Sequence, residues 1–233
     1  MSSGQAHQPR LGPAAVQVRR AGSADVDALH HLIESCFRGD GSRQGWTTEA
    51  DLLAGPRSDR REITAAVTGP SSSMLCAELS MLPTELDGGA PPGAPSPAAG
   101  SGHGAAPAGP AGSDAGGGAP PALVGCVRVA RDHREPDAPA HLGMLAVRPE
   151  HQGLGIGRIL VEAAEQLASR RWGAGELQML VLAPRTELIA WYERLGYRRT
   201  GATVPFREVA SDVLLAPDLR FVVLHKQLPA RAG

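Results

Sequence analysis

The stretch from His141 to Arg171, HLGMLAVRPEHQGLGIGRILVEAAEQLASRR, restricts the possible folds more than any other part of the chain. Leu142 to Val147 form a short apolar run that stops before Pro149, a pattern typical of a buried strand. From Ile156 onward the period changes to that of a helix with one apolar face. The residues on that face are Ile156, Leu160, Ala163, Ala164 and Leu167. The stretch therefore predicts a strand, a turn and an amphipathic helix that ends near Gly173.

Three glycines at alternate positions, Gly153, Gly155 and Gly157, separate the predicted strand from the helix. The first turn of a helix has unpaired N–H groups and partial positive charge, and glycine lets an anion approach that backbone closely. A single glycine would indicate only a tight turn, whereas three favour a phosphate-binding loop. The spacing is not the G-x-G-x-x-G of dinucleotide-binding folds. Arg158 stands where a P-loop requires lysine, so that motif is excluded as well.

The run from Val147 to Gly157, V-x-P-x-x-Q-G-x-G-I-G, resembles the acetyl-CoA signature of the GNAT superfamily of N-acetyltransferases. The resemblance extends over roughly residues 16–226, apart from a long insertion. It implies the GNAT fold, an α/β (α+β) architecture. In that fold a mixed, mostly antiparallel sheet contains a splayed parallel pair and carries helices on both faces. It also implies acetyl-CoA as co-substrate and direct transfer of the acetyl group to an amine of a small molecule or protein.

The same resemblance assigns cofactor-binding roles around the glycine turn. Backbone groups of Leu145, Ala146 and Val147 would pair with the pantetheine arm as an added strand, because splayed strands leave ladder groups unpaired. The pyrophosphate would lie on the residues of the turn, with Arg158 near it. These residues are Gln152, Gly153, Leu154, Gly155, Ile156 and Gly157.

A second motif lies in RTELIAWYERLGY, residues 185–197. It resembles the family pattern N-x-x-A-x-x-[FW]-Y-E-[KR]-L-G-[FY], and all positions from Trp191 to Tyr197 match. Two positions depart from the pattern, since Leu188 replaces alanine and Arg185 replaces an asparagine that often bonds CoA. We expect Arg185 to reach a phosphate or a pantetheine carbonyl instead.

Tyr192 is the predicted catalytic residue. In many relatives the phenol at its position lies beside the CoA sulfur and protonates the leaving thiolate. A core tyrosine is the alternative, because Leu188, Tyr192 and Leu195 share one helical face. Two functions from different classes are open. One is an acetyl-CoA-dependent N-acetyltransferase, and the other is a catalytically inactive acyl-CoA-binding sensor or interaction module.

The acceptor side carries no comparable signature. The resemblance places the region of Trp46 and Glu49 over the acceptor cleft, where these side chains would either face substrate or belong to the core and the solvent. His141 and Glu78 lie on predicted strands within reach of an amine, and a structural role is the simpler interpretation for both. No general base and no metal site is evident from the sequence.

Composition narrows the function classes further. A net charge of −1 gives no reason to expect nucleic acid as a partner. No apolar run is long enough to span a membrane, so no membrane partner is expected either. The first residues, MSSGQAHQPRLGP, lack the apolar core of a secretion signal, and we therefore expect a cytoplasmic location. Cys36, Cys76 and Cys126 are odd in number and widely spaced, which indicates free thiols. We expect a monomer or homodimer.

A single GNAT acetyltransferase domain is predicted over residues 14–228, with a disordered tail at 1–13. Residues 83–121 are predicted to be a disordered Gly/Ala/Pro-rich insertion within the domain, because such a segment has almost nothing to bury. The predicted strands are 16–19, 74–82, 123–129, 142–147, 176–182, 197–200 and 221–228. The predicted helices are 24–37, a short one at 46–53, a turn at 63–67, one from 156 and one at 185–195, with a loop at 38–45.

Overall fold

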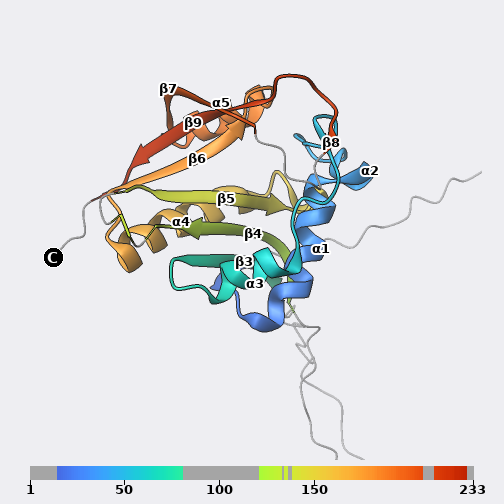
Figure 1. The fold of residues 1–233 in the computed structure, drawn as a ribbon. Coiled ribbons are helices and arrows are strands. Elements are labelled where there is room, and N and C mark those ends of the chain that lie inside the picture. The colour runs from blue at the N-terminus through green and yellow to red at the C-terminus, as the bar shows by residue number, and fades with distance from the viewer. Residues whose placement is uncertain (1–14, 81–120, 133, 136–137, 207–212, 230–233) are drawn as a thin grey trace, which may run out of the picture.

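Seven strands form one mixed sheet, in the order β1-β3-β4-β5-β6-β9-β7, in the computed structural model of the chain (Figure 1). The structure describes residues 15–80, 121–132, 134–135, 138–206 and 213–229. The predicted tail at 1–13 and the predicted insertion, apart from Pro121, lie outside these residues. The strands of the sheet are β1 (Ala15–Arg20), β3 (Ser72–Ser80), β4 (Ala122–Ala130), β5 (Ala140–Val147), β6 (Glu176–Leu182), β7 (Arg198–Pro205) and β9 (Arg220–Gln227).

Helices cover both faces of the sheet, as predicted. α4 and α5 lie on one face, whereas α1 and α3 lie on the other; in Figure 1, α4 passes behind β4 and β5. Strand β3 shows why both faces are apolar: Leu75 packs in the core under α4, and its neighbour Met74 packs in the core under α1. The helices are α1 (Val26–Phe37), α2 (Gly39–Ser42), α3 (Arg60–Thr68), α4 (Ile156–Trp172) and α5 (Thr186–Arg194), with 3-10 turns η1 (Ser23–Asp25) and η2 (Pro149–His151).

The pairing of β5 with β6 is the parallel step in the sheet, and it is short. The two strands pair from Ala140 to Leu142 on β5, opposite 177–179 on β6, while every other neighbouring pair in the sheet is antiparallel. Beyond this point β5 continues to Val147 and β6 to Leu182, and the described residues show no further pairing between them. The predicted splayed parallel pair is therefore confirmed.

A β-bulge in β5 lies where the strands separate. Cys126 on β4 is opposite Ala146, and Arg128 is opposite Gly143, so β5 has one more residue than β4 in this interval. Met144, inside the bulge, has a positive φ of 49°, a conformation that costs a non-glycine residue energy. The bulge bends β5 away from regular pairing just before the glycine turn.

Helix α4 begins and ends where the sequence predicted. Its N-cap is Gly155 and its C-cap is Gly173, and both adopt the left-handed conformation that glycine tolerates best. Arg170 and Arg171 lie in the last turn, where their positive charges interact favourably with the negative end of the helix dipole. Its buried stripe consists of Ile156, Leu160, Val161, Ala164 and Ala168.

The segment 46–53 corrects one prediction, because it forms turns and no helix. The hydroxyl of Thr48 accepts a hydrogen bond from Ala50 N (3.0 Å) and pairs with the Ser42 hydroxyl (2.8 Å). Such local side-chain bonds compete with helix formation. The segment leads into the short strand β2 (Leu53–Ala54), which pairs with β8 (Val213–Leu214). The predicted loop at 38–45 contains the short helix α2, and β7 extends to Pro205, beyond the predicted strand.

Candidate active site

A cavity of about 400 Å³ opens where β5 and β6 separate. Its walls are the second half of β5, the end of β6, the glycine turn with the start of α4, and α5. Residues between Cys36 and Arg57, from α1 and the loops after it, close the remaining side. The parts of the molecule that the two sequence motifs singled out thus meet around one space.

The β5 wall of the cavity includes Leu145, Ala146 and Val147, the three residues predicted to pair with pantetheine. On its β4 side this part of β5 is paired, at Cys126–Ala146 and at Gly125–Val147. On the β6 side, within the described residues, pairing stops at Leu142. An extended amide-containing arm has the right chemistry to fill such an unpaired strand edge.

The glycine turn leaves open backbone at the N-terminus of α4. Gly153 and Gly155 have φ values of 82° and 79°, and a Cβ at either position would meet no heavy atom within 4 Å. Gly157 is different, because a Cβ there would lie 3.5 Å from the ring of Trp191. Backbone conformation favours glycine at the first two positions, whereas a Cβ at the third would make only ordinary van der Waals contact. Of the predicted pyrophosphate residues, Leu154 is 62% exposed and does not line the cavity.

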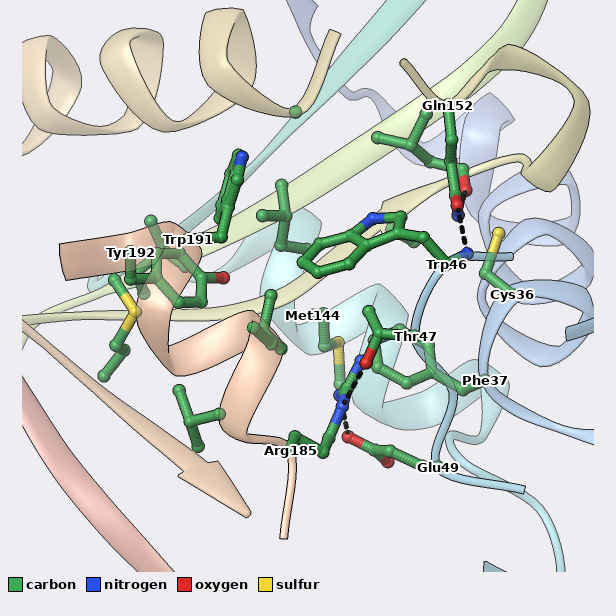
Figure 2. Close-up of a pocket in the computed structure, with 18 of the residues that line it drawn as sticks. Cys36, Phe37, Trp46, Thr47, Glu49, Met144, Gln152, Arg185, Trp191 and Tyr192 are labelled. Atoms are coloured by element: carbon green, nitrogen blue, oxygen red, sulfur yellow. Dashed lines mark hydrogen bonds and ion pairs between the residues drawn. The ribbon is translucent and has the colours of Figure 1, made fainter. Parts of the chain in front are cut away.

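Gln152 connects the turn to two other segments. Its Nε2 donates to the carbonyl of Val147 (3.0 Å), and its Oε1 accepts from the backbone N–H of Trp46 (3.0 Å) (Figure 2). A Cβ at Gly45 would lie 3.0 Å from Gln152 Nε2, so a side chain there would require the Gln152 amide to shift. The side chain therefore fixes the loop that carries Trp46 against the end of β5. Any contribution of Gln152 to pyrophosphate binding would come from its backbone.

Tyr192 lies on α5 and lines the cavity. Its side chain is nearly buried, and Figure 2 shows its hydroxyl pointing into the cavity, toward Trp46. Within the part of the chain that the structure describes, this hydroxyl has no hydrogen-bond partner. Burial raises the pKa of Tyr192, and the positive charge of Arg185 opposes this rise. The phenol is thus protonated over the ordinary pH range and is free to donate to a group in the cavity.

The second tyrosine of the motif has a different environment. The hydroxyl of Tyr197 donates to Glu165 (2.9 Å), and Lys226 also binds that carboxylate (2.8 Å). The rings of Tyr192 and Tyr197 are in edge contact at 5.7 Å. Tyr192 therefore lines the cavity, whereas Tyr197 takes part in a polar contact between α4 and β9.

Arg185 contacts the loop that follows α2. Its Nη1 donates to Glu49 (2.8 Å) and its Nε to the Thr47 hydroxyl (3.3 Å). The cofactor contact expected for Arg185 remains a prediction. Glu49 is nearly buried and lines the cavity, and it also contacts Arg38 (3.2 Å) and Arg57 (3.8 Å). Of the two acceptor-side candidates, Glu49 is therefore paired and not solvated.

Trp46, the other acceptor-side candidate, is 46% exposed and lines the cavity. Its ring centroid lies 6.5 Å from that of Trp191. The two base candidates lie elsewhere: neither His141 nor Glu78 belongs to the described cavity wall. Glu78 is paired with Arg19 (2.6 Å), and His141 is exposed on β5. Neighbouring protein atoms displace part of the water around its imidazole, and this desolvation together with the charge of Arg128 lowers the pKa of His141.

The three cysteines are free thiols, as predicted. Cys76 and Cys126 are buried opposite each other on β3 and β4, whereas Cys36 lines the cavity. Burial raises the pKa of Cys36 to about 11. Among the described residues, no cluster of His, Cys, Asp or Glu side chains is arranged to hold a metal ion. No described helix is both long and apolar enough to cross a membrane.

Several cavity residues carried no signal in the sequence. Phe37 ends a helix, Arg57 lies in an irregular loop, and Met144 reaches the cavity through the bulge. None belongs to a motif, and only tertiary contacts bring them to the site.

Comparison with known proteins matches part of the chain to a family. Residues 114–197 match the family model described as Acetyltransferase (GNAT) family. This region contains β4, β5, the glycine turn, α4, β6 and α5. A search of curated protein sequences found no significant match.

Solved structures share the fold over nearly the whole chain. The spermidine N-acetyltransferase from Vibrio cholerae in complex with CoA and spermine is 12% identical, with a TM-score of 0.54, covering 91% of this chain and 95% of that one. The ribosomal-protein-S18-alanine N-acetyltransferase from Escherichia coli is 14% identical, with a TM-score of 0.53 and coverages of 94% and 97%. A putative phosphinothricin N-acetyltransferase is 14% identical, with a TM-score of 0.55 and coverages of 92% and 99%. At these identities the likeness concerns the fold alone.

The glycine turn, the fold and the family match together define an N-acetyltransferase. Residues 114–197 match the GNAT acetyltransferase family, in agreement with the resemblance at Val147–Gly157. Acetyl-CoA is the acetyl donor typical of this family, and the Vibrio cholerae neighbour was solved with CoA.

Proposed function

We propose that this protein transfers an acetyl group from acetyl-CoA directly to the amine of a small molecule or protein. One observation carries the proposal. A single cavity is bordered by the unpaired edge of β5, the open glycine turn at the start of α4, and the hydroxyl of Tyr192. These are a site for an extended arm, a site for phosphates and a proton donor, in contact with the same space.

In this proposal the pantetheine arm adds to β5 at Leu145–Val147, and the pyrophosphate lies on the backbone of residues 152–157. The α4 N-terminus supports this, because its N–H groups and helix dipole favour an anion. Arg158, in the first turn of α4, is exposed and paired with Glu162 (2.8 Å), so it can turn toward a phosphate at little cost.

The chemistry follows from what the cavity offers. A neutral amine attacks the thioester carbonyl, the carbon–sulfur bond breaks, and the thiolate takes a proton from the Tyr192 phenol. The acetylated nitrogen loses its extra proton to water, and the tyrosinate regains one from solvent. Arg185 supports this cycle, because its charge favours the transient tyrosinate.

The proposal is tested first at the glycine turn. Gly155→Glu adds bulk and negative charge where the pyrophosphate would lie, so acetyl-CoA binding measured by calorimetry should be abolished. Gly201→Glu is the matched control, because Gly201 has a similar φ of 84° and open space around it, and it is exposed outside the cavity. Circular dichroism should show both variants folded. Unchanged acetyl-CoA affinity in a folded Gly155→Glu protein would contradict the proposed site.

Turnover is the second measurement. Release of free CoA thiol, with an amine panel and without amine, separates transfer to amines from simple hydrolysis. Acetyl-CoA binding without turnover of any amine would favour the inactive acyl-CoA-binding module. The domain limits of 14–228, the cytoplasmic location and the monomeric or homodimeric state remain predictions from the sequence.

A further inference from the structure

The acceptor side of the cavity carries more positive than negative charge. The ionised side chains in the described cavity wall are Glu49 and three arginines, Arg57, Arg158 and Arg185. Arg158 is next to the glycine turn, on the side proposed for the cofactor phosphates. Arg57 and Arg185 lie with Glu49 on the other side: in Figure 2, the Arg185–Glu49 pair and Gln152 are on opposite sides of the Trp46 indole.

Glu49, the carboxylate among these four side chains, already forms an ion pair with Arg38, which is not part of the described cavity wall. Arg38 donates to Glu49 (3.2 Å), and its remaining hydrogen bonds go to the carbonyls of Gly55 (2.9 Å) and Phe37 (3.2 Å). The side chains of Arg38 and Glu49 are each 11% exposed. Arg38 therefore balances the charge of Glu49. The carboxylate of Glu34 binds the backbone N–H groups of Arg57 and Ser58 from outside the cavity wall, so one positive charge remains in excess. The two guanidinium groups that face the cavity are those of Arg57 and Arg185.

Both remaining guanidinium groups have unused donors. Arg185 uses Nη1 and Nε, and its Nη2 has no partner among the described residues. The Arg57 guanidinium lies 5.1 Å above the Phe37 ring and 3.8 Å from Glu49, beyond hydrogen-bond distance. The backbone N–H of Arg57 donates to Glu34 (2.9 Å). This bond holds the backbone of Arg57 in place and leaves its guanidinium donors unused. Planar, fixed guanidinium groups with free donors are suited to bind a carboxylate.

We propose that Arg57 and Arg185 bind a carboxylate of the acceptor. The substrate is then a small amine that carries a carboxylate, which is the chemistry of an amino acid. This inference rests on the proposed N-acetyltransferase function and gives Arg185 an acceptor role in place of a cofactor contact. It also disfavours polyamines, because a second ammonium group would meet two arginines in a partly buried site.

The experiment compares acceptors that differ in one charge. The purified protein is assayed for CoA release with each common L-amino acid and with the matching L-amino acid amide, and with spermidine. The amide keeps the side chain and the amine. The α-amino group of the amide is less basic than that of the free amino acid, with a pKa near 7.7–8.0 as in peptides, so a larger fraction of it is neutral at pH 8. Slower transfer to the amide therefore cannot result from amine protonation.

Arg57 is the better arginine to mutate, because removing Arg185 would also remove the shortest ion pair of Glu49 (2.8 Å). Arg57→Gln should raise the KM for the preferred amino acid by roughly 10- to 100-fold, the usual effect of losing a charge-assisted hydrogen bond. The KM for acetyl-CoA should not change. Arg57→Lys should recover part of the affinity, since it restores the charge without the planar fork. The control is Arg61→Gln, the same charge change on the exposed surface of α3.

Support requires at least a tenfold preference for the amino acid over its amide, lost in Arg57→Gln and kept in Arg61→Gln. Equal use of acids and amides, or preferential use of spermidine, would overturn the carboxylate inference and leave the N-acetyltransferase function intact. Absence of turnover with every amino acid, in protein that binds acetyl-CoA, would overturn it as well. Failure to bind acetyl-CoA would instead remove the proposed function itself.

Discussion

Replacing Tyr192 with phenylalanine separates the catalytic from the structural interpretation of this residue. The substitution removes only the hydroxyl. The ring keeps its edge contacts with Trp191 and Tyr197, whose ring centroids lie 4.9 Å and 5.7 Å from its own. Since the hydroxyl has no hydrogen-bond partner among the described residues, no group there loses a bond. We therefore expect the free energy of unfolding to change by less than about 0.5 kcal/mol.

The effect on rate should be much larger. If the phenol protonates the leaving thiolate, its loss should lower kcat by roughly 10²- to 10⁴-fold, the usual contribution of general acid catalysis. The dissociation constant for acetyl-CoA should change little, because the proposed contacts to pantetheine and pyrophosphate lie on β5 and the glycine turn. Since burial raises the pKa of Tyr192, its deprotonation should not produce the alkaline limb of the pH–rate profile below about pH 10.

Tyr197→Phe is the matched control, because it removes the same atom from the neighbouring ring. Its hydroxyl is bonded to the carboxylate of Glu165 at 2.9 Å, and hydrogen bonds to charged groups contribute about 1.5–3 kcal/mol. Glu165 keeps Lys226 as a partner in this variant, so we expect the free energy of unfolding to fall by the lower end of this range, about 1.5 kcal/mol. For a chain of this size that corresponds to a fall in Tm of roughly 3–6 °C. Its kcat should stay close to wild type.

The two variants should thus show opposite patterns when Tm and kcat are measured on the same preparations. Tyr192→Phe should lose rate and keep stability, and Tyr197→Phe should lose stability and keep rate. Full activity in a stable Tyr192→Phe protein would refute the reasoning and leave water to protonate the thiolate. A Tm loss in Tyr192→Phe without a loss of rate per folded molecule would make Tyr192 a core residue.

Two further predictions concern other parts of the chain. Replacing residues 88–121 with a short Gly-Ser turn should leave Tm and acetyl-CoA affinity nearly unchanged, because the segment is poor in side chains to bury and Leu79 pairs with Ala122 at its base; a Tm lower by several degrees would show that the segment packs. Cys36, with its pKa raised to about 11, should react with iodoacetamide roughly 100-fold more slowly than a free cysteine at pH 7.5. Its rate should rise with pH up to about pH 11 and fall when acetyl-CoA fills the cavity that it lines, as mass spectrometry can measure; rapid labelling at pH 7.5 would contradict the burial.

The sequence alone determined the features that depend on local patterns. The apolar run at 142–147, the glycines from 153 to 157 and the helical period after them predicted β5, the turn and α4, since each depends on residues close together in the chain. The second motif likewise located α5 and singled out Tyr192. The helix predicted at 46–53 was wrong, because the Thr48 hydroxyl bonds Ser42 and Ala50 instead.

Only the tertiary structure decided which side chains meet around the cavity. Glu49 and Arg185 are 136 positions apart, and Trp46 and Gln152 are 106 apart, yet each pair is joined by a hydrogen bond. No local period encodes such contacts, because they depend on how β5 and β6 separate and on where the loops after α1 pack. The structure likewise distinguished the two tyrosines of one motif by burial and hydrogen bonding. Local sequence can specify a strand, a turn or a helix, but the charge balance of a site arises only when distant segments come together.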